Sequence, residues 1–142
     1  EDYRMNIDAK NLVLGRIAST AAKKALLGEK VNILNTELAI VTGGRFVEDK
    51  YMHRVQRSPD PTHGPFFPRT PIGIMRRTIR GMLPYKQGRG REAFERIKCY
   101  MGVPEDFKNA KLESVDKASF SKLPKYNFLI LKELCRSLGW RK

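Results

Sequence analysis

The sequence of 142 residues has only two cysteines, Cys99 and Cys135. Neither has a second cysteine or a histidine at metal-ligand spacing, so the sequence contains no zinc motif. Two isolated cysteines instead indicate a reducing cytoplasm. Long apolar segments are also missing, because no uncharged apolar run, Asn127 to Leu131 included, approaches the roughly 20 residues that span a bilayer. We therefore expect no membrane partner.

The N-terminal residues lack the apolar stretch of a signal peptide, since Glu1 to Lys10 is mixed in charge. The chain opens on Glu1 rather than on Met. We therefore treat residues 1–5 as a candidate extension, with Met5 as a candidate natural start, and leave them out of the fold prediction.

Negative charge is scarce as well. The chain has 15 Asp and Glu against 28 Lys and Arg, which gives a net charge of +13. The excess lies in the middle, where residues 45–98 carry 13 basic and 5 acidic side chains. Such a field concentrates phosphate-rich partners and makes their binding depend on salt. Apolar residues still make up 41% of the chain, enough for one domain over residues 1–142 with a buried core.

The stretch from Pro71 to Arg91, PIGIMRRTIRGMLPYKQGRGR, organises the prediction. Its spacing predicts a helix from Ile72 to Leu83 that Gly81 and Pro84 bring to an end. The apolar arc of this helix consists of Ile72, Met75, Ile79, Met82 and Leu83. The neighbouring arc and the glycine-rich loop beyond it supply six cations: Arg76, Arg77, Arg80, Lys86, Arg89 and Arg91. This arrangement indicates a polyanion partner, and a merely solvated cationic helix is the alternative.

Short apolar runs alternate with helical patterns along the rest of the chain. Strands are predicted at residues 11–14, 31–34, 38–41 and 97–101, and helical segments at residues 16–27, 46–55, 92–96 and 128–138. Alternation of this kind favours a parallel sheet, and continuously apolar strands favour helices on both of its faces. Residues 108–142 form a C-terminal tail that ends in the last helix.

The turn Thr42-Gly43-Gly44 follows a predicted strand and precedes a helix, where glycines can cradle a phosphate. Neither GxGxxG nor GxxxxGK[ST] occurs, so a simple turn is the favoured interpretation. Arg45 directly follows the turn.

Residues 56–71, QRSPDPTHGPFFPRTP, contain five prolines, which exclude regular structure and predict a stiff, extended arm. A disordered linker is the alternative, but linkers seldom carry paired aromatics such as Phe66 and Phe67. Arg57, His63 and Arg69 around these rings suit an arm that contacts RNA by stacking and by phosphate binding.

Several of these motifs together resemble the universal large-subunit ribosomal protein family thirteen. They are RRTIRGMLP at residues 76–84, LVLGRIAS at residues 12–19 and AIVTGGR at residues 39–45. The resemblance covers roughly residues 7–107, and His63-Gly64-Pro65-Phe66 is similar to the archaeal and eukaryotic branch, with the compact length favouring archaeal.

This resemblance implies a three-layer α/β/α sandwich with a four-stranded parallel sheet, basic loops and a C-terminal helix. It also implies a cytoplasmic, non-enzymatic constituent of the large ribosomal subunit that binds large-subunit rRNA and touches neighbouring ribosomal proteins. No cofactor, metal or small-molecule substrate is expected. By position, the signature assigns RNA contact to Arg76, Arg77, Arg80, Lys86, Arg89 and Arg91. The resemblance also assigns RNA contact to Arg57, His63 and Arg69 of the arm and to Arg45 after the glycine turn.

Two other functions use the same basic face: an enzyme that processes nucleic acid, and an RNA-binding regulator that acts off the ribosome. Enzymes of that kind usually need clustered carboxylates or an oriented base. Asp49, Asp60, Glu92 and Glu95 are scattered along the chain without ligand spacing.

Overall fold

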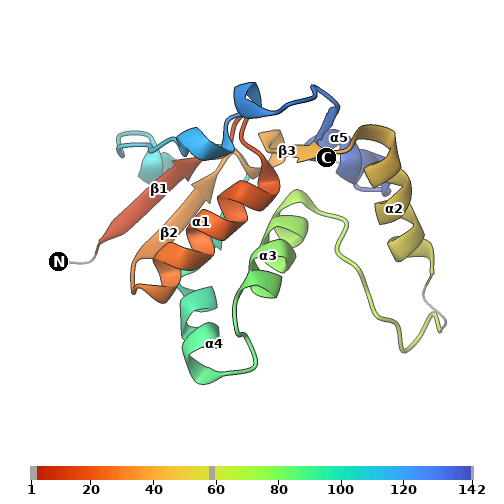
Figure 1. The fold of residues 1–142 in the computed structure, drawn as a ribbon. Coiled ribbons are helices and arrows are strands. Elements are labelled where there is room, and N and C mark those ends of the chain that lie inside the picture. The colour runs from red at the N-terminus through yellow and green to blue at the C-terminus, as the bar shows by residue number, and fades with distance from the viewer. Residues whose placement is uncertain (1–2, 58–59, 142) are drawn as a thin grey trace.

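The structure is a computed structural model that describes residues 3–57 and 60–141. Its helices and strands are β1 (Arg4–Asp8), α1 (Leu14–Leu26), β2 (Lys30–Leu34), β3 (Ile40–Thr42), α2 (Gly44–Gln56), α3 (Pro71–Met82), α4 (Gly88–Glu95), β4 (Ile97–Cys99), β5 (Phe128–Ile130) and α5 (Leu131–Ser137). Short 3₁₀ turns are η1 (Thr36–Leu38), η2 (Glu105–Phe107), η3 (Asp116–Ala118) and η4 (Phe120–Lys122). The predicted α/β class is confirmed (Figure 1).

A few predicted features lie outside the described residues: positions 1 and 2 of the candidate extension, Ser58 and Pro59 of the arm, and Lys142 at the end of the tail. Within the part that is described, no helix is long and apolar enough to cross a membrane.

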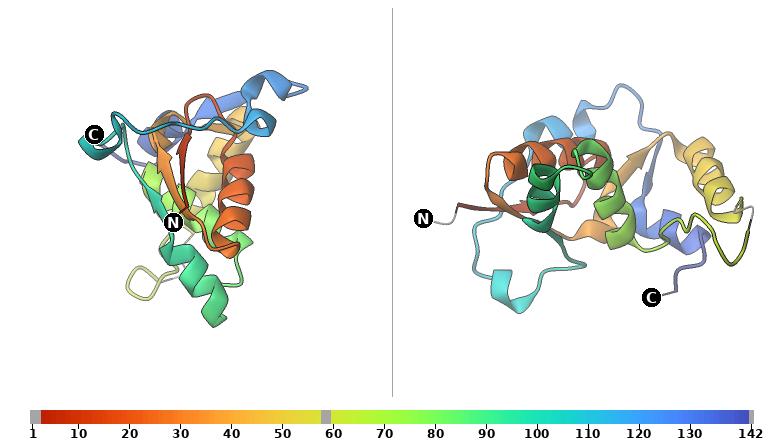
Figure 2. Two further views of the ribbon diagram at one scale, coloured as in Figure 1. Left: turned by 90° about the vertical axis from the view of Figure 1, so that its left-hand side faces the viewer. Right: turned by 90° about the horizontal axis from the view of Figure 1, so that it is seen from below.

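A three-stranded parallel sheet, in the order β1-β2-β4, forms the centre of the fold. Its register places Ile7 beside Ile33, and Ile33 beside Cys99. Because neighbouring strands in register point their side chains to the same face, these three residues share one apolar face with Val31 and Ile97. Helix α1 packs on this face, and the left panel of Figure 2 shows the helix beside the strands.

The opposite face of the sheet is polar. Asn32 lies beside Asn6 on one side and Lys98 on the other, and the Asn32 amide Nδ2 donates to Asn6 Oδ1 at 2.9 Å. A second helix layer would need an apolar surface here, but the alternation along β2 and β4 gives mainly one apolar face. The predicted three-layer sandwich is therefore not confirmed. The coil after β4 borders this face through Tyr100 and Phe107, whose ring centroids are 5.3 Å apart.

The predicted fourth parallel strand is not confirmed either. Strand β3, expected at residues 38–41, pairs antiparallel with β5, so that Ile40 lies opposite Ile130 and Thr42 opposite Phe128. Strand β5 takes up the first three residues of the predicted last helix, which begins only at Leu131. Phe128, Leu129 and Ile130 suit a strand, since aromatic and β-branched side chains pack well on a pleated surface.

The predicted first strand at residues 11–14 is wrong. Leu12 and Val13 form only isolated bridges, and α1 already begins at Leu14. The first strand is instead β1, which starts at Arg4 and thus uses residues that the prediction had set aside. Asn11, with φ of 58°, turns the chain between β1 and α1 in the left-handed conformation that Asn tolerates better than most residues.

Helices α1 and α3 pack against each other over the apolar face. Ala18, Ala21 and Ala25 are fully buried on α1, and their small side chains let α3 approach closely. Ile74 and Ile79 of α3 are buried in the same core cluster as these alanines. The tail belongs to the same core, because Leu131 and Leu134 of α5 and Leu138 directly after it are buried there.

The predicted helix at residues 72–83 is confirmed as α3. The Thr70 hydroxyl accepts a hydrogen bond from the Gly73 amide at 3.1 Å, and Pro71 occupies the first turn, where its missing N–H costs nothing. The apolar arc differs at two positions, since Ile74 is buried and Met82 is 44% exposed. Helix α3 therefore holds its arginines on a capped element anchored in the core.

Candidate nucleic-acid interface

Arg76 joins three elements. Its guanidinium lies 4.5 Å from the Phe94 ring centroid of α4, and Nη1 donates to the carbonyl oxygen of Ile97 in β4 at 3.4 Å. The side chain is half-buried. Arg76 was predicted to contact RNA, and the structure gives it a second task, because it ties α3 to α4 and to the edge strand of the sheet.

Arg80 lies near the end of the same helix. Its guanidinium is 4.9 Å from the ring centroid of Tyr85, in the turn that follows α3. Arg91 reaches the same residue from the other side of the turn, with Nε donating to the Tyr85 carbonyl oxygen at 3.4 Å. Tyr85 thus brings together two of the predicted RNA contacts that lie eleven positions apart in sequence.

Arg89 and Arg91 lie on the first turn of α4 and not in a loop, which corrects the prediction for the glycine-rich run. Gly90 is what allows a helix to form so close to the turn after α3. A Cβ atom on this residue would collide with the Pro84 carbonyl group and come within 2.9 Å of the Tyr85 nitrogen. Glycine is therefore needed at position 90 because it lacks a Cβ atom, which lets α4 pack closely on the turn, and not because of its conformational freedom.

Lys86, Arg89 and Arg91 are exposed around the start of α4. The backbone of a helix N-terminus already carries partial positive charge, so cations there raise the local positive potential further. Such an arrangement adds little to the stability of the free protein but attracts phosphates. We call Arg80, Lys86, Arg89 and Arg91 the exit cluster.

Arg77, although adjacent to Arg76, points to the arm. Its guanidinium lies 4.9 Å from the Phe67 ring centroid, and Nη1 donates to the Phe66 carbonyl oxygen at 3.3 Å. Successive residues of a helix are about 100° apart around its axis, so neighbours in sequence can serve different surfaces. The predicted row of three arginines is therefore divided between two surfaces.

The arm runs from the end of α2 back to the start of α3 (Figure 1). Within the predicted arm of residues 56–71, the structure assigns no helix or strand to residue 57 or to residues 60–70, whereas Gln56 is the last residue of α2 and Pro71 the first of α3. Phe67 packs on Tyr51 of α2 with centroids 5.5 Å apart in an edge-to-face arrangement, whereas Phe66 is 70% exposed. This packing favours the arm over the disordered linker.

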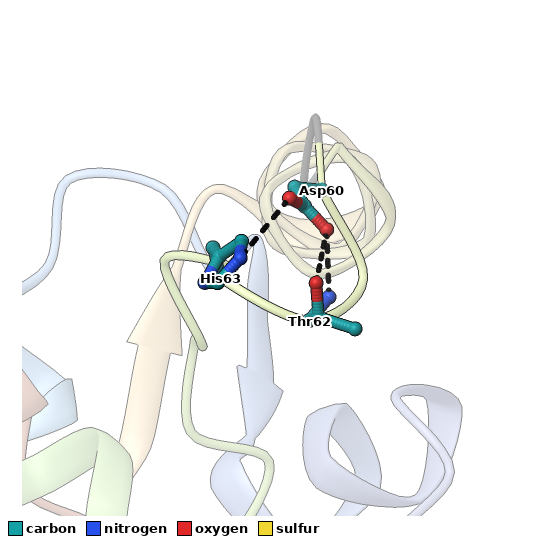
Figure 3. A network of polar contacts seen from close by, with 3 residues as sticks. All are labelled: Asp60, Thr62 and His63. Carbon is teal, nitrogen blue, oxygen red and sulfur yellow. Dashed lines mark hydrogen bonds and ion pairs between the residues drawn. The ribbon is translucent and has the colours of Figure 1, made fainter.

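A polar turn shapes the arm near its tip (Figure 3). Asp60 Oδ1 accepts hydrogen bonds from the Thr62 amide at 2.9 Å and the Thr62 hydroxyl at 2.7 Å, and these bonds lower the pKa of the Asp60 carboxyl. His63 Nε2 lies 3.9 Å from Asp60 Oδ2, and the imidazole is largely exposed. His63 is thus held beside a carboxylate of the arm.

Arg54 is the residue that the sequence prediction missed. From α2 it reaches both aromatic rings, with its guanidinium 5.7 Å from Tyr51 and 5.9 Å from Phe67. The three-residue spacing of Tyr51 and Arg54 on a predicted helix was the available signal. Arg57, a predicted contact, borders the same cleft as Arg54 and Arg77. We call Arg54, Arg57 and Arg77 the arm cluster.

The structure does not place Arg45 or Arg69 in either cluster. Arg45 is exposed in the first turn of α2. Arg69 is exposed at the end of the arm, and its Nη1 lies near Gly139, just beyond the end of α5. Both are open to solvent, but no described contact joins them to the other cations.

The candidate nucleotide turn is filled by the protein itself. The Gly43 amide donates to the Asn127 carbonyl oxygen at 2.9 Å, and a side chain at Gly44 would collide with the Asn127 amide group. Gly43 and Gly44 have φ of 107° and 55°, the left-handed conformation that favours glycine. These glycines therefore serve a tight turn against the tail.

Carboxylates do not neutralise the two clusters. Across residues 3–57 and 60–141, no ion pair joins an Asp or Glu to any member of the exit cluster or the arm cluster. The same residues contain no group of three or more His, Cys, Asp and Glu that could hold a metal. Both clusters can thus give their full charge to phosphates.

Comparison with known proteins places these features in a family context. The family model described as ribosomal protein L13 matches residues 3–106. A large ribosomal subunit protein uL13 from Methanopyrus kandleri is 45% identical over 95% of this chain and 86% of its own length. Homologues with the same name from Haloarcula marismortui and Archaeoglobus fulgidus are 42% and 40% identical, over 99% and 95% of this chain and over 94% and 87% of their own lengths.

Proposed function

Because the chain belongs to the ribosomal protein L13 family, we propose that it is a structural constituent of the large ribosomal subunit that binds and organises large-subunit rRNA. The archaeal relatives agree with the branch that the sequence resembles. The family is one of ribosomal proteins with a structural role, so the chain is not an enzyme. Its place is in the ribosome of the cytoplasm, beside neighbouring ribosomal proteins, and residues 1–142 act as one ribosomal-protein domain.

The observation that carries this proposal is the exit cluster. Four cations surround one turn and the helix start behind it, and no carboxylate among the described residues pairs with them. Arg80 stacks on Tyr85 and Arg91 bonds its carbonyl oxygen, so two guanidinium groups are oriented before RNA arrives. Orientation of this kind lowers the entropy cost of binding a phosphate backbone.

The remaining predicted contacts form a second set. Arg45, Arg57, His63 and Arg69 would reach further RNA segments, and Arg76 and Arg77 would contact RNA with the edges of guanidinium groups that are already stacked. Arginine suits this role because it binds phosphate and also stacks on unpaired bases. The protein would hold rRNA in shape during assembly, with no bond made or broken.

Sedimentation of a cell lysate at low and high salt tests the ribosomal role. We expect the protein to travel with the large subunit, to remain there at moderate salt, and to leave when the subunit is unfolded. Recovery mainly in the soluble fraction at both salt concentrations would contradict the proposal and favour a regulator that acts off the ribosome.

The role of the exit cluster is tested by the salt dependence of binding to purified large-subunit rRNA. A variant with Arg80, Arg89 and Arg91 changed to Ala should lower the slope of log K against log salt by about two, since each single-strand phosphate contact contributes about 0.7. An unchanged slope in a variant with native circular dichroism would remove these arginines from the interface.

The matched control changes Lys111, Lys117 and Lys125 to Ala, which removes the same charge from exposed positions of the tail. Its slope should stay close to that of the wild type. An equal flattening in both variants would mean that net charge alone, and not the exit cluster, governs binding.

A further inference from the structure

A cleft of about 390 Å³ lies between the last turns of α2, the arm and α3. Its lining consists of His53, Arg54, Arg57, Pro65, Phe67 and Arg77. Three consecutive segments, α2, the arm and α3, thus contribute three guanidinium groups, one imidazole and an apolar wall. The exit cluster has no part in this lining, so the cleft is a separate site.

The charge of this cleft differs from that of two other hollows among the described residues. A cleft of about 560 Å³ beside the polar face of the sheet is lined by several cations but also by the carboxylates of Glu92 and Glu95. A mainly apolar hollow beside α1 has Lys23 as its single charged group. The cleft at the arm contains three arginines and no carboxylate, and it therefore favours an anion.

The three arginines of the cleft, Arg54, Arg57 and Arg77, form its rim, and two of them are held in place. Arg77 is fixed by its hydrogen bond to the Phe66 carbonyl oxygen and by its position over the Phe67 ring, and Arg54 lies within 6 Å of the Phe67 and Tyr51 rings. A guanidinium stacked on a ring keeps its N–H groups free at the edge for phosphate oxygens. Arg57 is exposed beside them and extends the rim.

The apolar wall identifies the kind of RNA. Paired RNA offers an arginine rim its phosphates and sugars, but it keeps its bases stacked inside the helix and leaves an apolar wall without a partner. An unpaired nucleotide can place its base against Pro65 and Phe67 while its phosphate meets the rim. The volume of the cleft also falls within the range of pockets that hold small molecules.

We propose that this cleft receives one unpaired nucleotide of the rRNA, with its base on the wall of Pro65 and Phe67 and its phosphate on Arg54, Arg57 and Arg77. The proposal rests on the proposed function in one respect, namely that the partner is RNA. It goes further because it assigns an unstacked base to this cleft, whereas the exit cluster would bind the phosphate backbone alone.

Two RNA hairpins that differ only in a single bulged uridine, present in the stem of one and absent from the fully paired other, test the proposal with the full chain. Fluorescence anisotropy at low salt gives the Kd of each hairpin. We expect the wild type to bind the bulged hairpin about tenfold more tightly, within the range that stacking of one base on an aromatic side chain supplies.

The variant Arg54→Ala/Arg57→Ala should lose this preference. Both side chains are exposed, so their removal leaves the core intact. The control Lys111→Ala/Lys125→Ala removes the same charge from the tail, outside the cleft, and should keep the preference. Affinity for the paired hairpin should fall only slightly, and by a similar factor, in the two variants.

Equal affinity of the wild type for the two hairpins would overturn the proposal, as would a preference that survives Arg54→Ala/Arg57→Ala. A hexaglutamate peptide that displaces the bulged hairpin from the wild type at matched charge would assign the cleft to an acidic protein segment instead. These outcomes are independent of sedimentation with the large subunit: a protein that sediments with the subunit but lacks the preference loses only the cleft, whereas failure to sediment contradicts the ribosomal role.

Discussion

Replacement of Gly90 by Ala tests whether α4 is held on the turn before it. In an exposed helix, Gly→Ala usually stabilises a protein by about 0.5–1 kcal/mol, because glycine loses more conformational freedom on folding. Gly90 is buried, and a Cβ atom there would collide with the Pro84 carbonyl group. That group is backbone and cannot turn aside, so α4 must shift away from the turn.

The expected result is a loss of stability. Overpacking of this kind costs about 1–3 kcal/mol, which outweighs the intrinsic gain. For a chain of this size, each kcal/mol lowers Tm by about 2–4 °C, so Gly90→Ala should melt several degrees below the wild type. Because Arg89 and Arg91 flank Gly90, the same shift should weaken binding to rRNA.

Gly81→Ala and Gly88→Ala are the matched controls. Gly81 and Gly88 lie in α3 and α4, both are exposed, and a Cβ atom at either position meets nothing within 4 Å. These variants should be as stable as the wild type or more stable by up to about 1 kcal/mol. Thermal and urea unfolding give the comparison. A Gly90→Ala variant that is stabilised to the same extent as Gly81→Ala would refute the reasoning from close packing.

The other predictions concern Arg76 and the two thiols. Arg76→Ala should lower the free energy of unfolding by about 1 kcal/mol, because it removes the stacking on Phe94 and the hydrogen bond to Ile97. Arg89→Ala should leave the free energy of unfolding within about 0.5 kcal/mol of the wild type. Equal urea midpoints for the two variants would argue against a structural role for Arg76. Burial raises the pKa of Cys99 and Cys135 to about 12, so the native protein should resist iodoacetamide at pH 8 and react fully in guanidinium, as mass spectrometry can show. Above about pH 9 the thiols of the unfolded chain ionise and those of the folded chain do not, so the free energy of unfolding should fall as pH rises. Rapid labelling of the native protein would contradict the burial of the thiols, on which the expected resistance and the expected pH dependence both rest.

The elements that local signals specify agree best between sequence and structure. Helix α3 has an apolar period of 3.6, a threonine cap and a proline in its first turn, and it is found within one residue of the predicted limits. The basic excess of residues 45–98 likewise needs no fold to be recognised. These signals act over a few residues, so they are present in the chain before it folds.

The pairing of strands did not follow from local signals. The residues of strand β3 do not specify whether it pairs in a parallel or an antiparallel direction. Its partner β5 comes from the distant tail. The same run of Phe128 to Ile130 continues an apolar helical pattern and also suits a strand. Contacts between distant segments decide such cases, and those contacts depend on the whole core.

The sequence by itself determined the α/β class, the family, the amphipathic helix at the centre of the basic region and most of the cations that face outward. Only the tertiary structure decided which of those cations meet. Arg76 and Arg77 are neighbours in the chain, yet one lies on Phe94 of α4 and the other on Phe67 of the arm. The physical reason is that charge and periodicity are properties of a segment, whereas the packing of an arginine on an aromatic ring from another segment exists only once the chain has folded.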